Sequence, residues 1–219
     1  MASTGSAAPR RQRAVRSDAL VNREKIIAIA AELMCERGPN VPMAEIASVA
    51  GVGVATLYRT WPDRAALMHS LELRAYGQLI ATLERIRHSG ETGADAIRTY
   101  LYECLRLGPQ LVLPLRWAPP LVDQAAVAAR LELDTVLEQF LEDGRITGSV
   151  NADVNASDVM MFGALVTQPV PVGADFPVVA QRQVELFVRG LRAPSDQPLP
   201  GPMVTRQDIE DVFRSAAKD

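Results

Sequence analysis

The fold is decided by residues 50–64, which read Ala50-Gly51-Val52-Gly53-Val54-Ala55-Thr56-Leu57-Tyr58-Arg59-Thr60-Trp61-Pro62-Asp63-Arg64. The pattern predicts the end of one helix, a glycine turn, and a short second helix with Thr, Tyr and Arg on its outward side. Hydroxyl and guanidinium groups on one face of so short a helix suit the phosphates and base edges of DNA. The stretch therefore predicts a helix-turn-helix whose second helix enters the major groove.

The residues around this stretch predict a three-helix unit. Apolar residues recur at helical spacing within residues 17–37 and give a first helix with one buried face. A second helix is expected at 42–50, and Gly51 ends it because glycine adopts the left-handed backbone of a tight turn. The third helix is expected at 53–60, with Leu57 turned inward.

Five short motifs stand at fixed spacing within residues 17–67: Glu36-Arg37-Gly38, Ile46-Ala47, Ala50-Gly51-Val52, Thr56-Leu57-Tyr58-Arg59 and Trp61-Pro62-Asp63-Arg64-Ala65-Ala66-Leu67. They resemble the amino-terminal domain of the TetR (tetracycline-repressor-like) family of bacterial transcriptional regulators. The resemblance implies an all-α fold, in which a three-helix DNA-binding domain is joined to a helical ligand-binding and dimerisation domain. About nine helices are expected, with a possible extra helix at the carboxyl end.

The resemblance implies a DNA-binding surface made of seven residues: Val54, Ala55, Thr56, Tyr58, Arg59, Thr60 and Arg64. The hydroxyl groups would contact phosphates, and Arg64 would add charge at the start of the next helix. Val54 and Ala55 can only touch thymine methyl groups, which leaves Arg59 as the strong candidate for a bidentate contact to guanine. A phosphate contact by Arg59 is the equal alternative. Gly53 and Pro42 stand where the family often has a hydroxyl cap, which seats both helices less firmly.

Charge is distributed unevenly along the chain. The net charge is −3, but the first 67 residues hold nine Lys and Arg against six Asp and Glu. Residues 1–16 predict a disordered basic arm whose Arg11, Arg13 and Arg16 reach DNA phosphates or a minor groove. A solvated tail without contacts is the alternative.

Residues 68–193 predict a helical ligand-binding and dimerisation domain. Helices are expected at 63–88, 94–108, 121–143, 156–167 and around 184–191, with a short helix or loop at 109–120 and a turn at 143–145. Residues 156–167 are apolar nearly all round, and the resemblance implies a homodimer in which the last two helices of this domain pair with their copies. A buried hairpin within one chain is the alternative.

A ligand pocket is expected between the helices at 63–88, 94–108 and 121–143. Its candidate ligand-binding residues are Tyr100, Leu101, Arg116, Trp117, Phe140 and Phe162. These side chains predict a largely apolar, partly aromatic cavity for a small molecule of unknown identity. Plain core packing is the alternative for each of them.

The carboxyl-terminal residues 194–219 predict a proline-rich linker and an extra helix. Thr205 and Asp208 have capping-box spacing, and Phe213 is expected to dock the helix on the body. A disordered tail is the alternative.

Several classes of protein are excluded by what the sequence lacks. It has no phosphate-binding loop, nucleophile elbow or metal-ligand spacing, so we expect no enzyme, no cofactor and no metal. No apolar run reaches the ~20 residues of a membrane span, and no secretory signal is visible, which indicates a cytoplasmic protein. Cys35 and Cys104 are expected as buried reduced thiols, a disulfide or redox switch being the alternative.

These patterns together predict a ligand-responsive, sequence-specific transcriptional regulator. Its partner would be double-stranded DNA with a palindromic operator, and a small, largely apolar molecule would release the repressor from it. A helix-turn-helix regulator controlled by a protein partner is the alternative.

Overall fold

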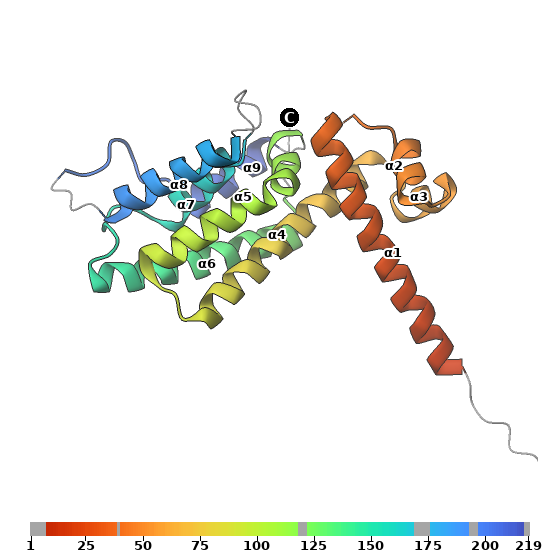
Figure 1. The fold of residues 1–219 in the computed structure, drawn as a ribbon, viewed down its shortest axis with the longest axis horizontal. Coiled ribbons are helices and arrows are strands. Elements are labelled where there is room, and N and C mark those ends of the chain that lie inside the picture. Colours follow the sequence, from red (N-terminus) through yellow and green to blue (C-terminus); the bar gives the residue numbers. More distant parts are fainter. Residues whose placement is uncertain (1–7, 39, 118–121, 169–175, 193–196, 217–219) are drawn as a thin grey trace, which may run out of the picture. The chain divides into compact units, whose positions relative to one another are not determined.

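The computed structural model describes residues 8–38, 40–117, 122–168, 176–192 and 197–216, and gives the backbone alone at 8–20, 35, 109–117 and 216. These residues form helices α1 (Ala8–Arg37), α2 (Met43–Ala50), α3 (Val54–Thr60), α4 (Arg64–Ser89), α5 (Gly93–Trp117), α6 (Gln124–Thr147), α7 (Ala156–Val166), α8 (Phe176–Arg192) and α9 (Arg206–Ala216) (Figure 1). They divide into two compact units, Met1–Leu67 and Met68–Asp219. The all-α prediction is confirmed.

The N-terminal unit is a small three-helix core. Within it α1 packs on α2, and α2 packs on α3. Gly51 takes φ 71° after α2, as predicted, and its own amide and the next one donate to carbonyls of α2. The largest side chains fully buried in this unit are Ile26, Met34, Ile46, Leu57, Trp61 and Leu67. This core fixes the position of the short helix α3.

Helix α1 begins earlier than the sequence pattern predicted. It starts at Ala8 rather than near residue 17, so residues 8–16 are helical where a disordered arm was expected. The segment is rich in Ala, Arg and Gln, which are strong helix formers, and Pro9 stands in the first turn, where no amide donor is needed. The charge pattern was therefore a poor guide to the backbone here.

Helix α5 differs from the prediction at its carboxyl end. It continues through Pro109 and Pro114 to Trp117, where a break was expected after residue 108. A proline removes one amide donor and kinks a helix, at a cost of about 3 kcal/mol. Along its length α5 packs against α6, α7 and α8.

Helix α6 also runs past the predicted turn. It passes through Gly144 and ends at Gly148, whose φ is 72°. A Cβ on Gly144 would lie 2.4 Å from the Cγ2 of Val150 and 2.9 Å from the Cα of Gly93. Gly144 therefore serves the close approach of α6 to the start of α5 rather than a turn.

The C-terminal unit is built around α5 and α6, which pack on each other, and α9 packs on α6. Two of its helices begin with reciprocal caps. Asn155 and Asp158 form a capping box on α7. At α9 the amide of Thr205 donates to Asp208 Oδ2 at 2.8 Å and the amide of Asp208 donates to Thr205 Oγ1 at 3.3 Å, which confirms the predicted box. No helix within the described ranges is both long and apolar enough to cross a membrane.

Candidate nucleic-acid interface and buried cavity

Helix α3 presents almost all of its side chains to solvent. Leu57 is fully buried, while Val54, Ala55, Thr56, Tyr58, Arg59 and Thr60 are all exposed. Tyr58 is 46% exposed, which is unusual for so large an aromatic residue. One leucine thus anchors the helix, and the other six side chains remain available to another molecule.

Neither α2 nor α3 has a side-chain cap at its amino end. The capping positions are Pro42 and Gly53, and both have extended backbone without a side-chain hydrogen bond. This agrees with the absence of hydroxyl caps read from the sequence. Helix α3 is held instead by the buried side chain of Leu57 and by Trp61, the buried residue at its carboxyl end.

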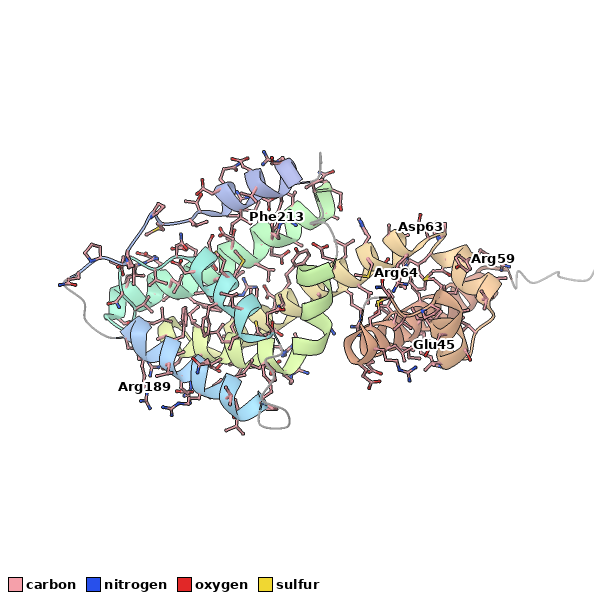
Figure 2. All side chains as sticks on the ribbon, turned by 90° about the horizontal axis from the view of Figure 1, so that it is seen from above. Glu45, Arg59, Asp63, Arg64, Arg189 and Phe213 are labelled. Carbon is pink, nitrogen blue, oxygen red and sulfur yellow. The ribbon has the colours of Figure 1, made fainter. Side chains whose placement is uncertain are left out.

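The predicted DNA-binding residues differ in how they are engaged. Arg64 is half-buried, and its Nη1 donates to the carbonyl of Val41 at 2.8 Å, so this guanidinium clamps the start of α4 within the unit. Thr60 donates its hydroxyl proton to the Thr56 carbonyl at 3.2 Å. Arg59 is exposed, and Figure 2 shows it on α3 close to the α3–α4 corner where Asp63 and Arg64 stand.

The predicted basic arm is only partly described. Arg11, Arg13 and Arg16 lie on the backbone of α1, and their side chains lie outside the described residues. Arg23, which the sequence pattern does not single out for this contact, places its guanidinium over the Trp61 ring at 5.5 Å from the ring centroid. This contact joins α1 to the end of α3. It connects residues far apart in the sequence, so no local sequence pattern predicts it.

The C-terminal unit contains an apolar cavity of about 160 Å³. Helices α4, α5, α6, α7 and α9 all contribute to its wall. The lining residues are Glu72, Ala75, Tyr76, Leu79, Tyr100, Cys104, Arg130, Leu133, Met160, Met161, Gly163, Ala164, Ile209 and Phe213. The cavity thus lies between the expected helices, but α7 and α9 close it as well.

Of the six predicted ligand-binding residues, Tyr100 lines the cavity. Leu101 and Phe140 are buried in the core packed around it, as the alternative reading held. The Phe162 ring stacks on Phe187 with centroids 4.1 Å apart and also lies outside the cavity lining. Arg116 and Trp117 stand in the last turns of α5, and their side chains lie outside the described residues.

Part of the cavity wall is a polar cluster that the sequence patterns do not single out. Arg130 pairs with Glu210, its Nε donating to Oε1 at 2.6 Å and its Nη2 to Oε2 at 2.8 Å. Its Nη1 is 3.4 Å from the hydroxyl of Tyr76, which donates to Glu72 at 2.9 Å. A signal existed, because Arg130 shares the buried face of α6 with Ala126, Leu133 and Leu137.

Burial controls the chemistry of the remaining polar groups in the wall. It raises the pKa of the Cys104 thiol to about 12 and the pKa of Tyr100 well above its usual value. Cys104 is a free thiol and buried, as expected, while the side chain of Cys35 lies outside the described residues. A thiol with so high a pKa is a weak nucleophile at neutral pH.

Comparison with known proteins gives the helix-turn-helix its context. Residues 26–71 match the family model described as bacterial regulatory proteins, tetR family. The HTH-type transcriptional repressor LfrR of Mycolicibacterium smegmatis is 28% identical over 119 residues, which cover 54% of this chain and 62% of the repressor. The chain therefore spans less than two thirds of this relative's length.

Solved structures extend the likeness to both units. A TetR transcription regulatory protein from Mycobacterium vanbaalenii aligns with a TM-score of 0.61 and 25% identity, covering 82% of this chain and 99% of that one. AibR, solved in complex with isovaleryl coenzyme A and operator DNA, aligns with a TM-score of 0.61 and 17% identity, covering 80% of this chain and 100% of that one. The motif, the helix order and these likenesses agree: residues 26–71 carry the domain of the tetR family of bacterial regulatory proteins, and the chain has the fold of solved TetR-type regulators.

Proposed function

We propose that this chain is a sequence-specific DNA-binding transcriptional regulator and that α3 is its recognition helix. The observation that carries the proposal is the exposure of every α3 side chain except Leu57. The exposed side chains combine hydroxyl groups, which can bind phosphates, with one exposed arginine, Arg59, which can bind a phosphate or the edge of a guanine. Because α3 has few side chains that can bind base edges, much of its specificity for DNA comes from phosphate contacts, half-site spacing and DNA shape.

We propose that the regulator acts as a homodimer through α7 and α8. Four large apolar side chains are exposed on these helices: Met161 at 48%, Leu165 at 67%, Val178 at 68% and Leu186 at 48%. A monomer rarely leaves such side chains together in water. A dimer would bind a palindromic operator, because its two recognition helices would be related by a two-fold axis.

We propose that a small, largely apolar molecule binds the cavity of the C-terminal unit and releases a repressor from its operator. Helix α4 contributes to the cavity wall and is continuous from Arg64 to Ser89. A ligand that shifts α4 at the cavity would therefore also shift its amino end, which follows directly after α3. The coupling requires a ligand that binds the free and the DNA-bound states with different affinities. The apolar cavity favours this mechanism over control by a protein partner.

Selection of bound genomic DNA tests the proposal. The purified chain is mixed with sheared DNA of its own organism, and the retained fragments are sequenced. A shared pseudo-palindromic site supports the proposed function, and recovery without any common sequence contradicts it. A Leu57→Asp variant, which disrupts the seat of α3, is the control and should retain no site.

A further inference from the structure

The strongest unassigned feature is the buried ion pair that joins α9 to the cavity. Arg130 is 6% exposed and Glu210 is 1% exposed, and two hydrogen bonds of 2.6 and 2.8 Å connect them. The pair places the Glu210 carboxylate behind the cavity wall, to which Arg130 and a second buried carboxylate, Glu72, contribute. Buried ion pairs contribute little net stability, because the cost of removing both charges from water offsets their attraction. Stability alone therefore does not explain this pair, and we look for a function.

Helix α9 reaches the cavity through a narrow strip of its surface. Ile209 and Phe213 line the cavity and are half-buried, and Glu210 is the buried residue among the described side chains of α9. The Phe213 ring lies over the Arg130 guanidinium, 5.0 Å from its centroid. The outer side of α9 carries Val212, which is 65% exposed. Docking of α9 thus uses Ile209, Phe213 and Glu210 at the cavity, together with an ion pair between Arg206 and Asp134 of α6 at 4.0 Å.

We propose that α9 is a latch on the cavity and that the ligand is a small apolar carboxylic acid whose carboxylate replaces Glu210 on Arg130. This inference deepens the proposed function and rests on it for the link to DNA. The released Glu210 cannot stay buried without a partner, so α9 leaves the cavity when the acid enters. Acid binding and α9 docking then exclude each other.

The charges of the cluster favour an acid over other ligands. A guanidinium binds a carboxylate with two parallel hydrogen bonds, the geometry that Glu210 already shows. An incoming carboxylate leaves the charge around Arg130 unchanged once Glu210 has left. A neutral molecule has no charge with which to displace Glu210, and an amine cannot take its place on Arg130. The other carboxylate in the wall, Glu72, accepts the hydroxyl proton of Tyr76.

The cavity with α9 docked gives the least space available to the apolar part of the ligand, because the release of Ile209 and Phe213 removes part of its wall. About 160 Å³ is available, and a cavity of ~150 Å³ holds one benzene molecule. The wall around it offers Leu79, Leu133 and the aromatic ring of Tyr100. A single ring or a short branched chain fits this space, with its acid group at Arg130.

The linker before α9 keeps the latch close to its site. The amide of Leu199 donates to Asp153 at 2.8 Å, and Asn155 Nδ2 donates to the carbonyl of Val204 at 2.8 Å. These contacts tie the chain to the start of α7 independently of Glu210. A released α9 therefore remains at high effective concentration and closes again when the acid leaves.

Three probes with the same ring test the ligand class on the full chain: benzoate, benzyl alcohol and benzylamine. Binding is measured by titration calorimetry, and docking of α9 by hydrogen exchange of residues 206–216. Benzoate should bind and lower the protection of α9 at least about fivefold, whereas the alcohol and the amine should leave that protection unchanged. Benzoate binding without a change in α9, or stronger binding of the amine, overturns the proposal.

Two matched variants separate the latch from general effects on α9. Glu210→Gln weakens the pair with Arg130 and should tighten benzoate binding at least about fivefold. Asp211→Asn removes an exposed ion pair with Arg214 on the same helix, 2.9 Å long, and should leave benzoate binding unchanged. Unchanged benzoate affinity in Glu210→Gln, with the variant folded by circular dichroism, contradicts the latch.

A separate readout distinguishes failure of this inference from failure of the proposed function. Both measurements above are made without DNA, and DNA binding is then measured with and without saturating benzoate. Release of α9 without any change in DNA affinity supports the latch and contradicts its role in the proposed ligand response. Loss of DNA affinity with α9 still docked supports the ligand response and overturns the latch.

Discussion

Two arginines near the corner between α3 and α4 illustrate how neighbouring residues of one type are put to different uses. Arg64 is half-buried and donates to the carbonyl of Val41, so its charge is committed to holding the unit together. Arg59 is exposed on α3 beside Tyr58, which is 46% exposed. Of these two arginines, Arg59 is the one whose guanidinium is exposed and can bind a base.

Replacing Arg59 by Ala tests base reading. Loss of a bidentate contact should relax the preference at one base pair of each half-site by about 1–3 kcal/mol. Tyr58→Phe removes only a hydroxyl that suits a phosphate and should weaken all sequences alike. Fluorescence anisotropy on a set of single-base operator variants measures both. If both variants lose affinity equally on every operator, Arg59 is a phosphate contact.

At the scale of elements, two glycines decide how close α5 and α6 come. Gly93 and Gly144 face each other so closely that a Cβ on Gly144 would lie 2.9 Å from the Cα of Gly93. Val150 closes the same contact from the chain beyond α6. The start of α5 and the end of α6 therefore approach at a distance that only glycine allows, and this contact sets the geometry of the helices around the cavity.

Gly144→Ala should lower the free energy of unfolding by about 1–3 kcal/mol, because its methyl group has no space. Gly77→Ala is the matched control, since a Cβ on Gly77 meets nothing within 4 Å. That substitution should raise the free energy of unfolding by about 0.5–1 kcal/mol, because alanine is the better helix former. Urea titration of both variants decides, and equal stability of the two would contradict the close approach.

Acid should loosen α9 through Glu210. The hydrogen bond from Arg130 lowers the pKa of Glu210 below its ordinary value. The pair therefore contributes fully above the pKa of an unfolded glutamate, ~4.3, and its contribution is lost as the pH falls through the lower folded value. Hydrogen exchange of α9, corrected for the intrinsic rate, should show this loss. The same pH dependence in Glu210→Gln would contradict it.

The sequence predicted the helix-turn-helix well because its signals are local. Leu57 and Gly51 act within a few residues of where they stand, so spacing alone places them. Helix ends were predicted less well, since α5 continues through Pro109 and α6 through Gly144. Packing between distant segments keeps both helices going, and a local rule does not include that energy.

The cavity was predicted only in part for the same reason. Tyr100 was found from its place on an apolar helix face, but Arg130 acquires its role from Glu210, 80 residues further along the chain. A charged residue on the buried face of each helix was the available signal. Reading the two faces together would have paired them, whereas reading aromatic residues alone selected Phe140 and Phe162, which pack in and against the core.

At the scale of the whole molecule, the proposed dimer rests on the exposed apolar side chains of α7 and α8. Leu165 and Leu186 are 67% and 48% exposed, whereas the buried sides of these helices belong to the core. Half-site spacing carries much of the proposed specificity, so assembly and DNA recognition are linked. A monomer would read one half-site and lose most of its preference for the full operator.

The double variant Leu165→Glu with Leu186→Glu should be monomeric, because it places charges in the proposed interface. Val212→Glu is the control, since Val212 is 65% exposed on α9, outside that surface. Sedimentation velocity at micromolar concentration should show a dimer for the unaltered chain and the control, and a monomer for the double variant. A monomeric unaltered chain would contradict the proposed dimer.

The most direct measurement for the central claim is the sequence of the genomic DNA that the purified chain retains. We expect a pseudo-palindrome whose half-sites lie about one helical turn or a multiple of it apart, and we expect it to be lost when Leu57 is replaced by Asp. Retention of DNA without a common sequence, or an unchanged site in the Leu57 variant, would contradict recognition by α3.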